Sequence, residues 1–377
     1  MRLWRSASGV LKDRYSIWVA KLSPYGPCKN PDLETVIIKA TSHDEYCMDY
    51  KNVQKVFQWL RVSPLYLKPL LCVLSKRMQK TRSWVVALKG LMLIHGIFCF
   101  DLPMVQRMGR LPFDLSHFSD GHVSSEKGWV LNGFVRSYFA YLDQRSANLR
   151  TETKKLQTKR GKESEEIPLT EELNNLEDLQ KLIDMLLQIK PKNELNMNIA
   201  LILEAMDCIM DEILEVYGKF SKDVNRVLLR VCDIGGKEEA NIGLDIIRKT
   251  QLQGEKIIFY FEFCKEIGVL NCSECPKIVR INEEEIEELK RIMKGGDEKA
   301  IVVRDNSKKF ENGLKTTVIT DQWEVFLDDV IVEVEQKHAP NAILSILDAN
   351  NPFVDESYSI VPYNPVQNYD LPDLICL

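Results

Sequence analysis

The sequence predicts an all-α fold, in which long helices pack as an α-solenoid or an irregular bundle, followed by a largely flexible acidic tail. Three observations support this prediction. Apolar residues recur with 4-3-4-3 spacing over residues 195–220, which places one apolar stripe along a long helix. No strand pattern with period two is visible before residue 300. No internal repeat of fixed period is visible either, which disfavours the known repeat families.

Shorter helices are expected in the first half of the chain. Helical periodicity covers residues 31–42, 49–61, 64–80, 82–99 and 128–147. Residues 101–127 and 148–167 lack this periodicity, so both stretches are expected to be loops.

Three longer helices are expected in the second half. Residues 168–172, Pro-Leu-Thr-Glu-Glu, begin the first, because acidic side chains in a first turn suit the positive end of the helix dipole. Pro191 and Asn193 mark the turn before the long helix. Gly235-Gly236 end that helix, and another is expected from about Glu238 to Gly268.

These elements divide the chain into three parts. We expect residues 1–22 to be an amphipathic membrane-contacting segment, 23–280 a helical domain, and 281–377 an acidic, mostly flexible tail. The middle part is long enough to enclose one large core. Beyond about residue 295 the helical periodicity is lost, which is typical of a chain that does not pack against a core.

Charge is sorted along the chain. Residues 1–30 carry six Lys and Arg against one acid, Asp13, for a net charge of +5. Residues 281–377 carry twenty Asp and Glu against nine Lys and Arg, for −11, while the whole chain has −5. A basic start indicates an anionic surface as partner, and an acidic end indicates protein partners. The acidic total and the lack of a reader motif disfavour nucleic acid.

Several function classes are disfavoured. No stretch reaches the ~18 uncharged apolar residues of a membrane span, since the nearest candidate, Trp84–Phe100, contains Lys89 and His95. Charged residues also interrupt any secretory signal at the start, so the protein is expected on the cytosolic side. No phosphate loop, catalytic carboxylate pair or nucleophile–base set is visible, so we expect no enzyme, no catalytic residue and no cofactor.

The spacing of the cysteine and histidine residues does not predict a metal site. Cys272 and Cys275 form a CxxC pair, but no second pair supplies the four ligands of a tetrahedral zinc site, so both are expected to be reduced thiols in a loop. His43 and His95 have no cysteine or carboxylate at ligand spacing and are expected to be structural.

The first 22 residues have the pattern of a helix lying in a membrane interface. Apolar side chains gather near one face of a helical wheel, flanked by Trp4, Val10 and Tyr15, and they are Leu3, Ala7, Leu11, Trp18 and Leu22. The candidates for insertion are Leu3, Trp4 and Leu11, and the candidates for lipid contact are Arg2, Arg5 and Lys12. The alternative is that Leu11, Ile17 and Trp18 dock onto the domain.

Three segments carry a family resemblance. They are Lys39-Ala-Thr-Ser-His-Asp44, Lys80-Thr-Arg-Ser-Trp-Val-Val-Ala-Leu-Lys-Gly-Leu-Met-Leu-Ile-His95 and Phe134-Val-Arg-Ser-Tyr-Phe-Ala-Tyr-Leu-Asp-Gln-Arg145. In order and spacing they resemble the ANTH domain of plant clathrin assembly proteins, over about residues 5–280. The resemblance implies a helical superhelix of the ANTH/ENTH type that binds phosphatidylinositol 4,5-bisphosphate, and a flexible tail that recruits clathrin and other coat proteins.

The resemblance also implies a lipid site. The family motif is a Lys, a spacer, and then Lys-x-Lys/Arg-His/Tyr; Lys39 and Lys51 fit it, and both are candidate lipid-binding residues. Asp49 and Asn52 occupy the other two positions, and Asp49 adds a negative charge where a phosphate would dock. An alternative therefore stays open: a helical SNARE- or protein-binding scaffold with lost or weak phosphoinositide affinity, in which helices around 195–270 would hold a vesicle SNARE.

The tail contains short motifs for protein partners. Asn351-Pro352-Phe353 is the tripeptide that EH domains recognise, because the Asn-Pro turn presents Phe to an apolar pocket. Trp323 and Phe326, followed by Asp328-Asp329, resemble the WxxF signal that adaptor appendage domains bind. The alternative for this stretch is an amphipathic helix over 321–337 that folds back on the body.

The resemblance and the charge sorting together predict a non-enzymatic clathrin assembly adaptor in endocytosis or vesicle budding. It would bind phosphoinositide membranes at the cytosolic leaflet and recruit clathrin, EH-domain proteins and adaptor-appendage proteins, with vesicle SNAREs as further partners. Its expected place is the cytoplasm, as a peripheral membrane protein of clathrin-coated pits and vesicles, at the plasma membrane, the Golgi apparatus or both.

Overall fold

The structure is a computed structural model, and it describes residues 2–22, 30–100, 102–121, 123, 125–159, 167–191, 198–272 and 274–294. These residues form helices joined by turns and contain no strand, which confirms the all-α prediction. The helices are α1 (Arg2–Leu22), α2 (Pro31–Ala40), α3 (Tyr50–Val62), the 3-10 helix η1 (Pro64–Tyr66), α4 (Leu67–Lys80), α5 (Trp84–Phe98), α6 (Pro103–Gln106), α7 (Ser125–Lys159), α8 (Leu169–Leu186), α10 (Ala200–Ile234), α11 (Lys237–Glu266) and α12 (Glu283–Met293).

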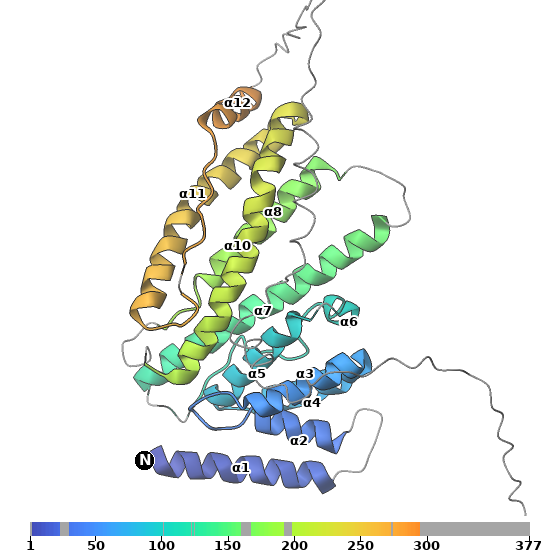
Figure 1. Ribbon diagram of the computed structural model, residues 1–377, viewed down its shortest axis with the longest axis vertical. Coiled ribbons are helices and arrows are strands. Elements are labelled where there is room, and N and C mark those ends of the chain that lie inside the picture. Colours follow the sequence, from blue (N-terminus) through green and yellow to red (C-terminus); the bar gives the residue numbers. More distant parts are fainter. Residues whose placement is uncertain are drawn as a thin grey trace, which may run out of the picture.

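The helices pack in successive layers from one end of the molecule to the other (Figure 1). α1 packs on α2, α2 on α3 and α4, α5 on α7, and α7 on α8. Helices α8, α10 and α11 form an elongated layer, and α12 packs on α10 and α11 at its far end (Figure 1). The buried residues form one continuous core from Leu33 to Leu289. This is the solenoid arrangement that the sequence predicts. No helix in the described part of the chain has the length and apolar character needed to cross a membrane.

A buried polar network lies in the core between α5, α7 and α10. Helix α5 is mostly apolar and is buried from Trp84 to Ile97, yet it contains Lys89 and His95. The Nδ1 of His95 lies 2.6 Å from the hydroxyl of Tyr138 in α7, and its Nε2 lies 3.2 Å from Glu212 in α10. Arg145 of α7 also donates to Glu212, at 3.1 Å. The network joins three helices, and His95 is structural, as expected.

Helix α7 continues through residues 148–159, which the periodicity assigned to a loop. This stretch contains neither Gly nor Pro and is rich in helix-forming side chains, so nothing in it ends the helix. Lys155 donates to Asn175 of α8 at 2.8 Å and lies 3.7 Å from the carboxylate of Glu171. A polar helix held by such contacts has no apolar stripe, which is why its periodicity was not visible.

The packed body also extends beyond residue 280, where the sequence placed the domain end. Helix α12 buries Ile286 and Leu289 against α10 and α11. Its first turn carries Glu283, Glu284 and Glu285, which favour a helix N-terminus. The segment before this helix is also held in place, because the backbone N–H of Val279 donates to the hydroxyl of Tyr217 at 2.9 Å.

Candidate membrane-binding surface

Small residues form the face of α1 that meets the domain. Gly9 and Ala20 are buried, and Ser16 between them is half-buried. Gly9 lies so close to His43 that a Cβ added to the glycine would be 2.6 Å from the Cβ of His43. A close helix approach of this kind requires glycine at the contact. The docked face therefore consists mainly of small side chains, with Ile17 half-buried beside them, whereas Leu11 and Trp18 are exposed.

The opposite side of α1 exposes a stripe of large apolar side chains. Leu11, Tyr15, Trp18 and Leu22 are 66%, 66%, 58% and 62% exposed, at spacings of four, three and four residues. Side chains at this spacing lie along one face of a helix. The rings of Tyr15 and Trp18 lie 6.1 Å apart. The domain therefore does not cover Leu11 and Trp18, and α1 has an unpartnered apolar stripe, called here the α1 stripe.

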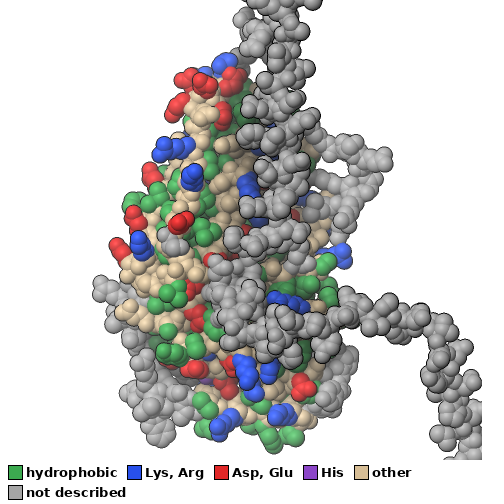
Figure 2. Space-filling model, viewed as in Figure 1, with side chains coloured by type: hydrophobic (Ala, Val, Ile, Leu, Met, Phe, Trp, Pro, Cys, Tyr) green, Lys and Arg blue, Asp and Glu red, His purple; other side chains and the backbone are tan. Residues whose placement is uncertain are grey.

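Basic side chains accompany the α1 stripe. Lys12, Arg14 and Lys21 are exposed on the same helix. At the end of the molecule where α1 lies, hydrophobic and basic side chains stand next to one another on the surface (Figure 2). Four of the predicted residues, Arg2, Leu3, Trp4 and Arg5, belong to α1, but their side chains lie outside the described part of the structure.

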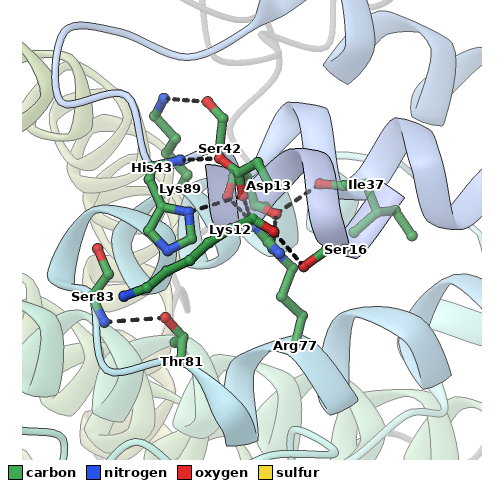
Figure 3. A network of polar contacts seen from close by, with 11 residues as sticks. Lys12, Asp13, Ser16, Ile37, Ser42, His43, Arg77, Thr81, Ser83 and Lys89 are labelled. Atoms are coloured by element: carbon green, nitrogen blue, oxygen red, sulfur yellow. Dashed lines mark hydrogen bonds and ion pairs between the residues drawn. The ribbon is translucent and has the colours of Figure 1, made fainter. Parts of the chain in front are cut away.

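Asp13 attaches α1 to the rest of the protein. Its carboxylate accepts the backbone N–H of His43 at 2.8 Å and lies 2.8 Å from Nδ1 of the same residue (Figure 3). The guanidinium of Arg77 donates to it at 2.9 Å and to the carbonyl oxygen of Thr41 at 2.7 Å. Burial raises the pKa of the Asp13 carboxyl, but the hydrogen bonds from His43 and Arg77 outweigh burial, so its pKa lies below the usual value. We call these contacts the Asp13 clasp.

The sequence contains a signal for this clasp, the single acid Asp13 in a basic segment, which a helical wheel does not reveal. Asp13 is the one acid among residues 1–30, and it stands four residues after Gly9 and seven before Ala20. An acid in an otherwise basic segment, on the face with the smallest side chains, indicates a specific partner rather than solvent. Helical-wheel analysis misses it because it ranks faces by hydrophobicity alone.

The two lysines of the expected lipid motif are exposed on neighbouring helices. Lys39 lies in the last turn of α2 and Lys51 in the first turn of α3. The two residues that depart from the motif have a structural role between them. Asp49 is the N-cap of α3: its carboxylate accepts the backbone N–H of Asn52 at 3.2 Å and the side-chain amide of Asn52 at 2.6 Å. A capping pair thus replaces two potential phosphate contacts.

The loop between α2 and α3 is anchored at both ends. Lys89, buried in α5, donates to Ser42 at 3.3 Å. At the other end, Glu204 of α10 accepts the backbone N–H of Met48 at 3.1 Å and the hydroxyl of Tyr50. These anchors hold the main chain that carries Lys39 and Lys51. Two acids of the same loop, Asp44 and Glu45, are exposed.

The remaining predicted sites lie outside the described residues. These are the EH-domain motif Asn351, Pro352 and Phe353 and the adaptor motif Trp323 and Phe326. Among the described residues, no group of three or more His, Cys, Asp or Glu side chains could hold a metal ion.

Comparison with known proteins shows the family. A family model described as the ANTH domain matches residues 32–295. This chain belongs to the ANTH-domain family. The ANTH chain is 43% identical over 342 residues to "Putative clathrin assembly protein At1g25240" of Arabidopsis thaliana, which covers 87% of this chain and 88% of that protein. It is also 44% identical over 346 residues to "Putative clathrin assembly protein At1g68110" of Arabidopsis thaliana. This alignment covers 87% of this chain and 89% of that protein.

Family membership has two direct consequences. ANTH clathrin assembly proteins are non-enzymatic structural proteins, so this chain is not an enzyme. The match from 32 to 295 includes α2 through α12 and leaves α1 outside it. The lipid motif of the resemblance therefore lies within the matched residues, whereas the α1 stripe lies on the helix before them, which the Asp13 clasp attaches to the matched part.

Proposed function

We propose that this ANTH chain is a clathrin adaptor that docks on anionic membranes of the cytosolic leaflet, with α1 lying in the membrane interface. The observation that carries this proposal is the α1 stripe, four large apolar side chains exposed beside Lys12, Arg14 and Lys21. A helix with one apolar face and flanking basic residues binds at the boundary between headgroups and acyl chains.

The energetics favour such docking. Each Lys or Arg near an anionic leaflet contributes about 1 kcal/mol, so Lys12, Arg14 and Lys21 contribute about 3 kcal/mol together. Transfer of the exposed parts of Leu11 and Trp18 out of water adds about 1–2 kcal/mol each. Trp18 and Tyr15 suit this position, because their rings are apolar and carry one polar atom. Together these contributions support reversible binding of a peripheral protein.

Lys39 and Lys51 have a secondary role in the proposal. They add positive charge, but the Asp49–Asn52 cap provides neither the second basic residue nor the ring of the family motif. We therefore expect the protein to depend on the total negative charge of the vesicle more than on one phosphoinositide headgroup.

Recruitment is assigned to the residues after α12. The related Arabidopsis proteins are described as putative clathrin assembly proteins, which supports clathrin as a partner of this chain. Asn351-Pro352-Phe353 would bind EH domains, and Trp323 and Phe326 would bind adaptor appendages. The corresponding location is the coated pit or coated vesicle, at the plasma membrane or the Golgi apparatus.

Vesicle co-sedimentation tests the membrane proposal. The test variant is Leu11→Asp/Trp18→Asp, and its matched control is Leu252→Asp/Phe259→Asp, which changes two side chains of α11 that are 58% and 68% exposed. Vesicles of neutral lipid, of phosphatidylserine, and of phosphatidylserine with phosphatidylinositol 4,5-bisphosphate are compared. We expect the test variant to lose binding to both anionic vesicles by about tenfold or more, and the control to bind normally.

The other outcomes are equally specific. Lys39→Glu/Lys51→Glu is expected to weaken binding to both anionic vesicles by a similar, smaller factor. Undiminished binding of the Leu11→Asp/Trp18→Asp variant would refute the role of α1. Failure of the wild type to bind any vesicle would favour the alternative, a helical SNARE- or protein-binding scaffold. For the tail, EH domains should retain the wild type and release Phe353→Ala.

A further inference from the structure

An open groove lies between α4 and the stretch formed by α6 and the residues that follow it. Its volume is about 450 Å³. Leu71 and Cys72 of α4 line one side, and Met104, Met108 and Pro112 line the other. The hydroxyl of Ser75 donates to the carbonyl oxygen of Pro112 and so holds the two walls together. The lining is thus mainly apolar, and two methionines give it an adaptable shape.

The charged side chains at the rim of this groove are basic. Neither α4, Leu67–Lys80, nor the segment 102–112 contains an Asp or Glu. Lys68 and Lys76 line the groove and are exposed, and neither forms an ion pair with a described residue. An apolar floor between unneutralised lysines is suited to a peptide that combines apolar and acidic side chains.

The same chain contains a segment with that chemistry. Residues 321–335 carry six acids and no Lys or Arg. Trp323, Phe326, Leu327 and Val330 follow one another at the i, i+3, i+4 and i+7 positions of a helix face. Its apolar residues match the floor of the groove, and its acids match the rim.

We propose that residues 321–335 dock in the groove between α4 and α6 of their own chain. The described residues end at Lys294, and the 28 residues 295–322 can span up to about 95 Å when extended. The longest described helices, α7 and α10, have 35 residues and measure about 50 Å, so the segment can reach the groove from α12. The connection within one chain raises the effective concentration of the segment at the groove.

Docking would control access to the adaptor motif. Trp323 and Phe326 would be buried in the groove and withheld from other proteins, until a partner with higher affinity displaces them. This consequence rests on the proposed recruiting function. The docking itself depends on neither α1 nor membrane binding, so it can be tested separately.

Photo-crosslinking in the full-length chain tests the proposal. A benzophenone amino acid replaces Gln79, an exposed residue whose amide reaches Pro112 at 3.5 Å at the rim of the groove, and crosslinked peptides are identified by mass spectrometry. We expect crosslinks to residues 321–335. Trp323→Ala/Phe326→Ala should reduce their yield by about tenfold, and so should Lys68→Glu/Lys76→Glu. Adding Asp328→Lys/Asp329→Lys to the latter variant should restore the yield, because the charges are then reversed on both sides.

Matched controls separate docking from general effects. Phe353→Ala in the tail, and Lys222→Glu/Lys256→Glu at exposed positions of α10 and α11, should leave the crosslinks unchanged. A mixture of isotopically light and heavy chains shows which copy supplies the segment. Crosslinks in which both peptides carry the same isotope label support the proposal.

Three outcomes would overturn it: mixed-isotope crosslinks, which identify the tail of a second copy; no crosslinks to residues 321–335; or a yield that the test variants do not change. None of these outcomes depends on vesicle binding, so the α1 proposal and this one can fail independently.

Discussion

Asp13 and His43 are in double contact: the carboxylate accepts the backbone N–H at 2.8 Å and lies 2.8 Å from ring atom Nδ1. His43 belongs to the segment Lys39–Asp44, within the match to the ANTH family, whereas Asp13 lies on α1, outside that match. The contact therefore attaches α1 to the segment that the family model matches. It also sets the rotation of α1, because a helix held at Asp13 and Gly9 turns Leu11 and Trp18 toward solvent.

The Asp13 clasp should weaken in acid. The pKa of Asp13 in the folded protein lies below its usual value of 3.8, so its contribution to stability is present above that pH and lost as the pH falls through the folded value. We expect the free energy of unfolding to fall as the pH drops below about 4, and to fall less steeply in Asp13→Asn. Urea denaturation across this range measures it, with Asp245→Asn on the exposed face of α11 as control. An unchanged slope in Asp13→Asn would contradict the expectation.

Gly9 should not tolerate a side chain, whereas a second helical glycine should. In Gly9→Ala the new methyl group would lie 2.6 Å from the Cβ of His43, so α1 must shift away. We expect a loss of about 1–3 kcal/mol in the free energy of unfolding. Gly218 of α10 has nothing within 4 Å of a Cβ, and Gly218→Ala should gain about 0.5–1 kcal/mol through helix propensity. Equal effects of the two substitutions in thermal unfolding would refute the close packing of α1.

Restoring the family's lipid motif should exchange stability for affinity. Asp49→Lys/Asn52→His supplies the missing basic residue and ring, and should strengthen binding to vesicles that contain phosphatidylinositol 4,5-bisphosphate. The same change removes the N-cap of α3 and should lower the free energy of unfolding by about 1 kcal/mol. Asp49→Asn is the control, because asparagine caps as well as aspartate but adds no positive charge. A gain in affinity without loss of stability would show that the cap is unimportant.

The buried carboxylate of Glu212 should be essential for stability. It receives hydrogen bonds from Arg145 and Tyr141 and contacts His95, and these groups are buried. Glu212→Gln leaves Arg145 without its buried counter-charge and should lower the free energy of unfolding by about 3–5 kcal/mol. Glu215→Gln is the matched control: its carboxylate is 38% exposed and lies 3.5 Å from Arg145, so its loss should cost less than about 1 kcal/mol. Urea denaturation of both variants provides the comparison.

Much of the fold was predictable from the periodicity of apolar residues. The stripe over 195–220 led to α10, and the capping and glycine signals led to α8 and α11, because these helices bury one continuous face. The end of α7 and the whole of α12 were not predicted. Both are polar or acidic segments whose helices depend on a few tertiary contacts, such as Lys155 with Asn175 and the burial of Leu289.

The sequence alone determined that this chain is helical, that its charge is sorted, and that its first 22 residues form an amphipathic helix. Only the tertiary structure decided how that helix is used. An apolar stripe can be buried equally well by a domain or by a membrane, so hydrophobicity could not distinguish the two. Close packing distinguishes them, because the face with Gly9 and Asp13 fits against His43 and also buries Ala20, which leaves Leu11 and Trp18 exposed. In the same way, only the structure showed that Asp49 and Asn52 form a helix cap where the family motif has lipid contacts.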